Sequence, residues 1–110
     1  MANTFKNAFS ASIGTSAVDV YTVPSATTST IIGASVANIG SSAVNVDVTV
    51  TDTSGTITAH LVKGAPVPVG GALVVIGGDQ KVVLEATDKI TVTSDTASSI
   101  DAVISVLEQS

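Results

Sequence analysis

Residues 44–51 have the sequence Val-Asn-Val-Asp-Val-Thr-Val-Thr, in which every second residue is valine and the residues between are polar. Strict alternation with a period of two predicts a strand with one face in a hydrophobic core and the other in water. The next four residues, Asp52–Gly55, predict a β-turn, because aspartate favours its first position and glycine tolerates positive φ. The following run, residues 56–62, is therefore expected to pair with residues 44–51 as a hairpin.

Similar short runs recur along the whole chain, separated by Gly, Pro, Ser and Asp. This spacing is typical of a sandwich or barrel, and the many β-branched residues disfavour helix. Gly33 predicts a bulge or a close backbone approach. Residues 64–71, with two prolines, predict a crossing loop or an edge segment. The other expected strands are residues 5–13, 18–23, 28–39, 73–76, 81–85, 90–93 and 100–107. We therefore predict an all-β fold: a single-domain antiparallel β-sandwich of about eight strands.

The composition limits the classes of partner. The 110 residues fit one domain (1–110), in which residues 1–12 are a possible extended N-terminal arm. Only 12% of residues are charged, against about 25% in ordinary domains, and serine and threonine supply most of the polarity. A net charge of −5 with four scattered lysines argues against a nucleic-acid partner. The low charge suits a protein packed among neighbours, although many extracellular sandwiches share it.

Neither a membrane span nor a secretory leader is expected. The longest apolar stretch, residues 72–76, is far shorter than the ~20 residues that a spanning helix needs. The first residues lack the apolar segment of a signal peptide, so we expect no export by that route. The chain has no cysteine and therefore forms no disulfide.

Side chains that could act in catalysis or bind a metal are too few and too scattered to predict a catalytic site. His60, the single histidine, lies on an expected strand without metal-ligand spacing, and no Gly-x-Ser-x-Gly motif is present. A strand residue at an edge or an interface is the favoured interpretation of His60. We therefore expect no enzyme, no cofactor, no metal and no small-molecule substrate. A loop-borne calcium site stays open, although turn formation better explains these acids: Asp79, Glu85, Asp88, Asp95 and Asp101.

Three segments are candidate interfaces. Phe5 and Phe9 could dock into a neighbouring subunit or close one end of the chain's own core, and the second interpretation is favoured. The last expected strand has apolar residues on both faces, so a second subunit or the N-terminal arm is expected to cover one of them. The residues singled out as interface candidates are Phe5, Phe9, Pro66, Pro68, Val103 and Leu107.

Four motifs and the end of the chain resemble a family of small all-β structural proteins of tailed bacteriophages. The motifs are Tyr-x-Val-Pro, Val-x-Asn, Pro-x-Pro and Leu-Glu-x-x-Asp-x-Ile, in this order. Here they are Tyr21–Pro24, Val36–Asn38, Pro66–Pro68 and Leu84–Ile90, and Glu108 follows near the end. The family usually has glycine before the aspartate of the fourth motif. This chain has Thr87 there, which should matter only to the local turn.

The resemblance implies a β-sandwich, often jelly-roll-like, that is displayed on a virion and has no catalytic residues. The leading expectation is a capsid decoration or cement protein, assembled in the bacterial cytoplasm. Its expected partners are the major capsid protein and copies of itself, as a homotrimer, without nucleic acid or membrane. The alternative is a tail, fibre or baseplate component that binds a host surface receptor, and the shortage of aromatic residues favours the decoration protein.

Overall fold

The computed structural model describes residues 2–77 and 80–110, which form nine strands and no helix. Residues 78 and 79 lie outside the described residues, and so does the predicted turn acid Asp79. No described helix could span a membrane. The strands are β1 Asn3–Ile13, β2 Val18–Thr22, β3 Thr28–Asn38, β4 Val44–Asp52, β5 Ile57–Val67, β6 Ala72–Ile76, β7 Val82–Leu84, β8 Lys89–Ser94 and β9 Ile100–Gln109.

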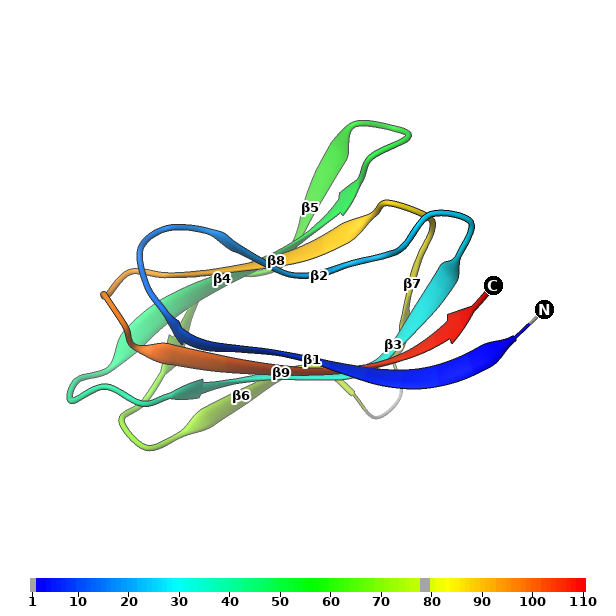
Figure 1. Ribbon diagram of the computed structural model, residues 1–110. Coiled ribbons are helices and arrows are strands. Elements are labelled where there is room, and N and C mark those ends of the chain that lie inside the picture. The colour runs from blue at the N-terminus through cyan, green and yellow to red at the C-terminus, as the bar shows by residue number, and fades with distance from the viewer. Residues whose placement is uncertain (1, 78–79) are drawn as a thin grey trace.

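Two antiparallel sheets stack as the layers of a sandwich (Figure 1). One sheet has the order β1-β9-β3-β6, with β7 also paired to β3, and the other has the order β2-β8-β4-β5. If β6 and β7 are counted as one interrupted partner of β3, the chain is a long hairpin rolled up from its ends. The first strand pairs with the last, and the pairing continues inward to β4 and β5. This is the eight-stranded jelly-roll order, so the predicted sandwich is confirmed.

Alternating residues from both sheets fill the space between the layers. Val44, Val46 and Val48 of β4 are at most 2% exposed, as their period of two predicted. From the opposite sheet, β9 contributes Ile100, Ala102, Ile104 and Val106, all buried. β4 pairs with β5 as the predicted hairpin, and its turn projects from the upper layer in Figure 1. The core therefore consists largely of small β-branched side chains.

Three other segments differ from or refine the sequence interpretation. The register of β3 against β9 shifts between Ile31 and Gly33, which confirms the predicted bulge. Residues 64–67 extend β5, the edge strand of its sheet, and Pro66 lies opposite Asn45. The residues that could have formed an N-terminal arm lie instead in β1, which pairs with β9 from Asn3 onward.

Two buried polar side chains fix the connections between strands. The Asn38 side-chain amide donates to the carbonyls of Ser42 and Val67, at 2.9 and 3.0 Å, and its oxygen accepts from the Gly40 amide at 2.8 Å. Asp88 accepts from the backbone amides of Thr53 and Glu85, both at 3.0 Å. These bonds join the β3–β4 turn to the end of β5, and the β4–β5 turn to the β7–β8 turn.

Core packing predicts that alanine substitutions at two isoleucines, which differ chiefly in burial, lower the free energy of unfolding by different amounts. Ile31 is fully buried, whereas Ile57 is 62% exposed. Replacing Ile31 with alanine should lower the free energy of unfolding by about 2–5 kcal/mol, because it removes buried methylenes and leaves a cavity. The matched substitution Ile57→Ala should lower it by less than about 1 kcal/mol. Urea denaturation checks both, and equal losses would contradict the assignment of the core.

The turn before Asp88 gives a second prediction. Thr87 has a φ of 69°, a left-handed conformation that glycine adopts without steric cost. Thr87→Gly and Thr87→Ala both remove the hydroxyl, but only glycine relieves the backbone. The glycine variant should therefore be more stable than the alanine variant by about 1 kcal/mol in thermal unfolding. Equal stabilities would show that the backbone at Thr87 is not strained.

Candidate functional site: an apolar outer sheet face

The outer face of the β1-β9-β3-β6/β7 sheet carries large apolar side chains. Strand register places Phe5, Leu107, Thr30 and Val83 in one row across the sheet, and Phe9, Val103, Ser35 and Val74 in a second row. We call this surface the outer apolar face, defined by these apolar residues together with Ile32. Its most exposed members are Phe5 (75%), Val74 (69%) and Phe9 (66%).

Four of the six candidate interface residues therefore meet on one surface. Phe5 and Phe9 come from β1, and Val103 and Leu107 come from β9. The favoured expectation that the phenylalanines close one end of the core is wrong, because residues 5 and 9 alternate with the inward-facing residues of β1 and point outward. β1 lies beside β9 rather than over it and leaves Val103 45% exposed.

The two candidate prolines lie elsewhere. Pro66 is exposed on β5, at the edge of the other sheet, and Pro68 is exposed in the turn that follows. The structure therefore separates the candidates into one group of four and a distant pair.

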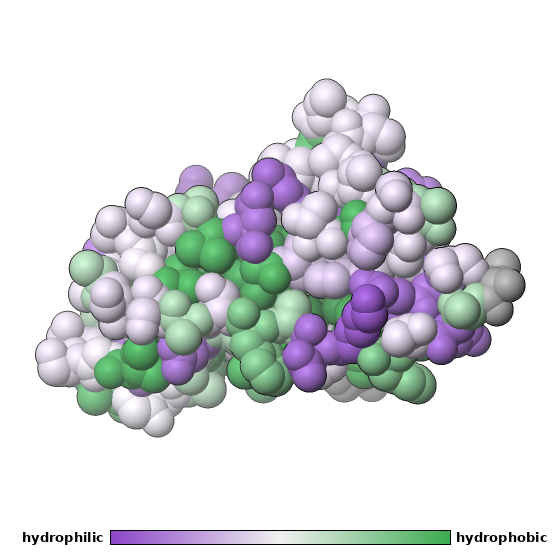
Figure 2. Space-filling model, viewed as in Figure 1, coloured by the Kyte–Doolittle hydropathy of each residue, from purple (hydrophilic) through white to green (hydrophobic). Residues whose placement is uncertain are grey.

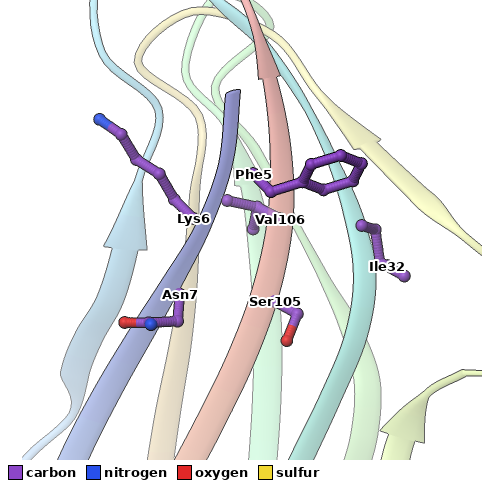
Figure 3. A pocket seen from close by; sticks show the side chains of 6 residues that line it. All are labelled: Phe5, Lys6, Asn7, Ile32, Ser105 and Val106. Carbon is purple, nitrogen blue, oxygen red and sulfur yellow. The ribbon is translucent and has the colours of Figure 1, made fainter. Parts of the chain in front are cut away.

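Small residues hollow out the centre of the outer apolar face. One hollow of about 360 Å³ is bordered by Phe5, Ile32 and Ser105. In Figure 3 the Phe5 ring extends across β9 toward Ile32, while Lys6 points the other way. A second hollow of about 240 Å³ lies over Gly33, between Val74 and Val103, and shares Ser105 with the first. The face therefore has apolar projections around a floor of glycine and serine.

The bulge in β3 helps to build this face. Ile31 is fully buried and faces Val106, whereas Gly33 pairs with Ser105. The extra residue, Ile32, borders the hollow with Phe5 instead of adding to the core. The sequence signal for the bulge was Gly33, but nothing in the local pattern showed that Ile32 would line the outer surface.

The outer face of the second sheet is polar. We call it the hydroxyl face, and it bears Thr49, Thr51, Thr58, Thr91 and Thr93 with Asp19, Asp47 and Lys89. Asp19 forms a salt bridge with Lys89 at 3.2 Å and accepts from the Thr91 hydroxyl at 2.8 Å, and these interactions lower its pKa. His60 lies exposed on this sheet, opposite Thr49 in the register. The two outer faces of one sandwich thus differ sharply in chemistry.

A polar cluster ties the two sheets together near the chain ends. The Tyr21 hydroxyl of β2 donates to Glu108 of β9 at 2.5 Å and lies 2.6 Å from the Ser29 hydroxyl. The Lys6 ammonium lies 3.1 Å from the second Glu108 oxygen. The hydrogen bond from Tyr21 is the main cause that lowers the Glu108 pKa, against burial, and Lys6 adds to it. Burial, with the hydrogen bond to Glu108, raises the pKa of Tyr21 to about 12.

This cluster gives a structural reason for the Tyr-x-Val-Pro motif and for the glutamate near the end of the chain. Tyr21 begins the Tyr-x-Val-Pro motif on β2, and Glu108 lies near the chain end on β9 of the other sheet, so the packing of the two sheets brings them together. It also places Lys6 on the inner side of the edge strand β1, where an inward charge discourages uncontrolled strand pairing. The cluster is a structural clamp with a neutral phenol, not an activated nucleophile. Ala8, Val18 and Val20 are half-buried and pack against the hydrophobic core. Figure 2 shows hydrophobic and hydrophilic residues lying side by side on this view of the molecule.

Three acidic side chains meet at one end of the sandwich. Carboxylate oxygens of Asp52, Glu85 and Asp88 lie within 4.8 Å of one another. Two of these side chains already accept hydrogen bonds that stabilise turns. Asp88 accepts from two backbone amides, and Asp52 accepts from the Ser54 hydroxyl at 2.8 Å and the Gly55 amide at 3.3 Å. Sequence reasoning missed this grouping because Asp52 lies on a different hairpin, and the cluster supports turn formation rather than a metal site.

Comparisons with known proteins support the fold. Neither a family model nor a curated protein matches this sequence. A solved chain from Bacillus endospore appendages, described as disulfide-linked pili, superposes with a TM-score of 0.58 and 11% identity, covering 99% of this chain and 87% of its own. A chain from the acid-stable capsid of Helicobacter pylori bacteriophage KHP30 gives a TM-score of 0.53 and 11% identity, covering 98% and 87%. At this identity the likeness concerns the fold.

The Tyr21–Glu108 clamp predicts a pH-dependent loss of stability. Because folding lowers the Glu108 pKa, this contribution is complete above the unfolded value of about 4.3 and is lost as pH falls through the folded value. Glu108→Gln should therefore be less stable than wild type by about 1 kcal/mol at pH 7, and the deficit should shrink in acid. The matched variant Glu85→Gln replaces the other, exposed glutamate, which lies beside two carboxylates, so it should not lower the stability at pH 7. Urea denaturation across this pH range checks both, and a deficit that does not change with pH would contradict the clamp.

Tyr21 gives the complementary alkaline prediction. Its pKa is raised in the folded protein, so the contribution of the phenol is complete below about pH 10 and is lost as pH rises through about 12. Wild type should therefore lose stability over this interval more steeply than Tyr21→Phe, because phenylalanine has no proton to lose. Thermal unfolding of both proteins measures the difference, and parallel losses would contradict the assignment.

Proposed function

We propose that this chain is a non-enzymatic structural protein of a bacteriophage virion, where it acts as a decoration or cement protein on the head shell. The observation that carries the proposal is the contrast between the two outer faces. One has hydroxyl and charged groups suited to water, and the other exposes phenylalanine, valine and leucine. A contiguous apolar patch on the surface is often a functional site, and here it stands opposite a polar face.

Three further observations support the proposal. The jelly-roll order and the similarity to a chain from the KHP30 capsid structure agree with a shell-associated protein. In the described residues, His60 is exposed and opposite a threonine, and the acidic cluster is engaged in turns. The resemblance to small all-β structural proteins of tailed bacteriophages also supports it, and the partners that we propose are the major capsid protein and copies of this chain, as a homotrimer.

A second candidate function is a subunit of a tail or another appendage. The similarity to the Bacillus appendage chain favours it, because that structure belongs to a filament. Those pili are described as disulfide-linked, whereas these 110 residues contain no cysteine and cannot form such a link. A filament built from this chain would therefore depend on non-covalent contacts, for which the outer apolar face is available.

Immunogold electron microscopy of particles from a producing lysate tests this proposal. An antibody raised against the hydroxyl face, for example against the exposed β4–β5 turn, should label particle heads over their whole surface. Preimmune serum and particles made without this chain are the controls. Label confined to tails would favour the second candidate, and unlabelled particles with the protein free in the lysate would contradict a virion role.

A further inference from the structure

We propose that the outer apolar face is the site at which a second copy of this chain docks. The inference rests on the proposed function and deepens it, because a structural subunit with an exposed apolar face needs something to cover that face. The proposed occupant is the same face, or an adjoining surface, of an identical chain. The argument depends on charge, on shape and on area.

The rows of the outer apolar face lack the charged side chains that oppose self-association. The chain carries a net charge of −5, so two copies repel each other over most orientations. The two rows of residues across the outer apolar face contain no charged side chain. Lys6 and Glu108, on the same strands, form their salt bridge on the inner side, and Asp101 accepts from the Ser12 amide at one end of the sheet. Docking here brings together two rows without charge, with Asp101 at the margin of the face.

The outer apolar face carries both projecting side chains and hollows, so the surfaces of two copies can be complementary in shape. Phe5 and Phe9 lie at the β1 edge of the face, and the hollows over Ser105 and Gly33 lie nearer its centre. A second copy therefore offers both aromatic projections and hollows that can receive them. In a closed ring of copies, such as the expected homotrimer, the projections of one chain meet the hollows of the next, and this contact is repeated at every interface. A partner selected by charge would find no ionic group in either row.

The exposed area is in the range that an interface needs. A buried aromatic side chain contributes roughly 150–250 Å², so the exposed fractions of Phe5 and Phe9 leave roughly 200–350 Å² in water. Val74, Val83 and Val103 are 69, 62 and 45% exposed and lie on the same face. Together these side chains reach the size of the largest patch on a typical monomer, about 300–600 Å², and an interface of ~800 Å² per partner would bury them with the surface around them.

Sedimentation velocity of the full chain over a wide concentration range tests the proposal. Wild type should associate, and Ser105→Asp should sediment as a monomer, because it places a carboxylate on the floor of the contact. Thr49→Asp is the matched control, since it adds the same charge to a central strand of the hydroxyl face. Ser105 is exposed, so its variant should stay folded, which a thermal unfolding curve verifies.

A second pair of variants removes apolar surface instead of adding charge. Phe5→Ser with Phe9→Ser should weaken self-association by on the order of a hundredfold, because buried aromatic anchors dominate interface energies. Ile57→Ser with Val69→Ser removes exposed apolar side chains outside the face and should leave association unchanged. The measured mass also tests the expected homotrimer.

A wild type that is monomeric at every concentration would overturn the inference, and so would association that the face variants and their controls affect equally. The failures of the two proposals are distinguishable. A monomer that nevertheless labels phage heads would overturn only the docking of a second copy. An oligomer that is dispersed by Ser105→Asp but labels no particle would overturn only the virion role.

Discussion

The packing of one face of each sheet against one face of the other is the constraint on which this structure depends. The sandwich has no disulfide, and its core consists largely of valine, isoleucine and alanine, so its stability depends on close packing of many small side chains. Three of the buried polar groups, Asn38, Asp88 and Glu108, have hydrogen-bond partners that fix the turns and the chain ends. The inner faces of the sheets therefore account for the stability and the fold. The side chains of the two outer faces are not needed for the core.

The two outer faces present different kinds of side chain. The hydroxyl face pairs threonines with a few compensated charges, and short hydroxyl side chains lose little conformational entropy when they are ordered. The outer apolar face keeps two phenylalanines and three valines in water, which a free monomer gains nothing from. Edge strand β1 contributes both to the Tyr21–Glu108 clamp and to the outer apolar face. Its inward Lys6 belongs to the clamp, and its outward Phe5 and Phe9 belong to the face. This asymmetry is the physical basis for the structural role that we propose.

Sequence patterns predicted what is local and missed what depends on pairing across the sheets. The alternating valines of residues 44–50 and the Asp52–Gly55 turn determined a hairpin that the structure confirms. The apolar residues on both faces of β9 indicated a face needing cover. The favoured of two interpretations of Phe5 and Phe9, that they close the core, is wrong, because hydrophobicity alone does not say which face of an edge strand points inward. Tyr21 and Glu108, or Asp52 and Asp88, come together only through the rolled topology, and no spacing within one segment could have shown it.

The central claim is that the outer apolar face is covered by protein in the assembled state, while the hydroxyl face meets solvent. Electron cryomicroscopy of particles that carry this chain tests it most directly. The account predicts that Phe5, Phe9 and Val103 lie against density from another chain, with the same residues of a neighbouring copy close by, and that Thr49 and Thr91 face solvent. A reconstruction in which the phenylalanines face solvent and the threonines lie in the contact would contradict it.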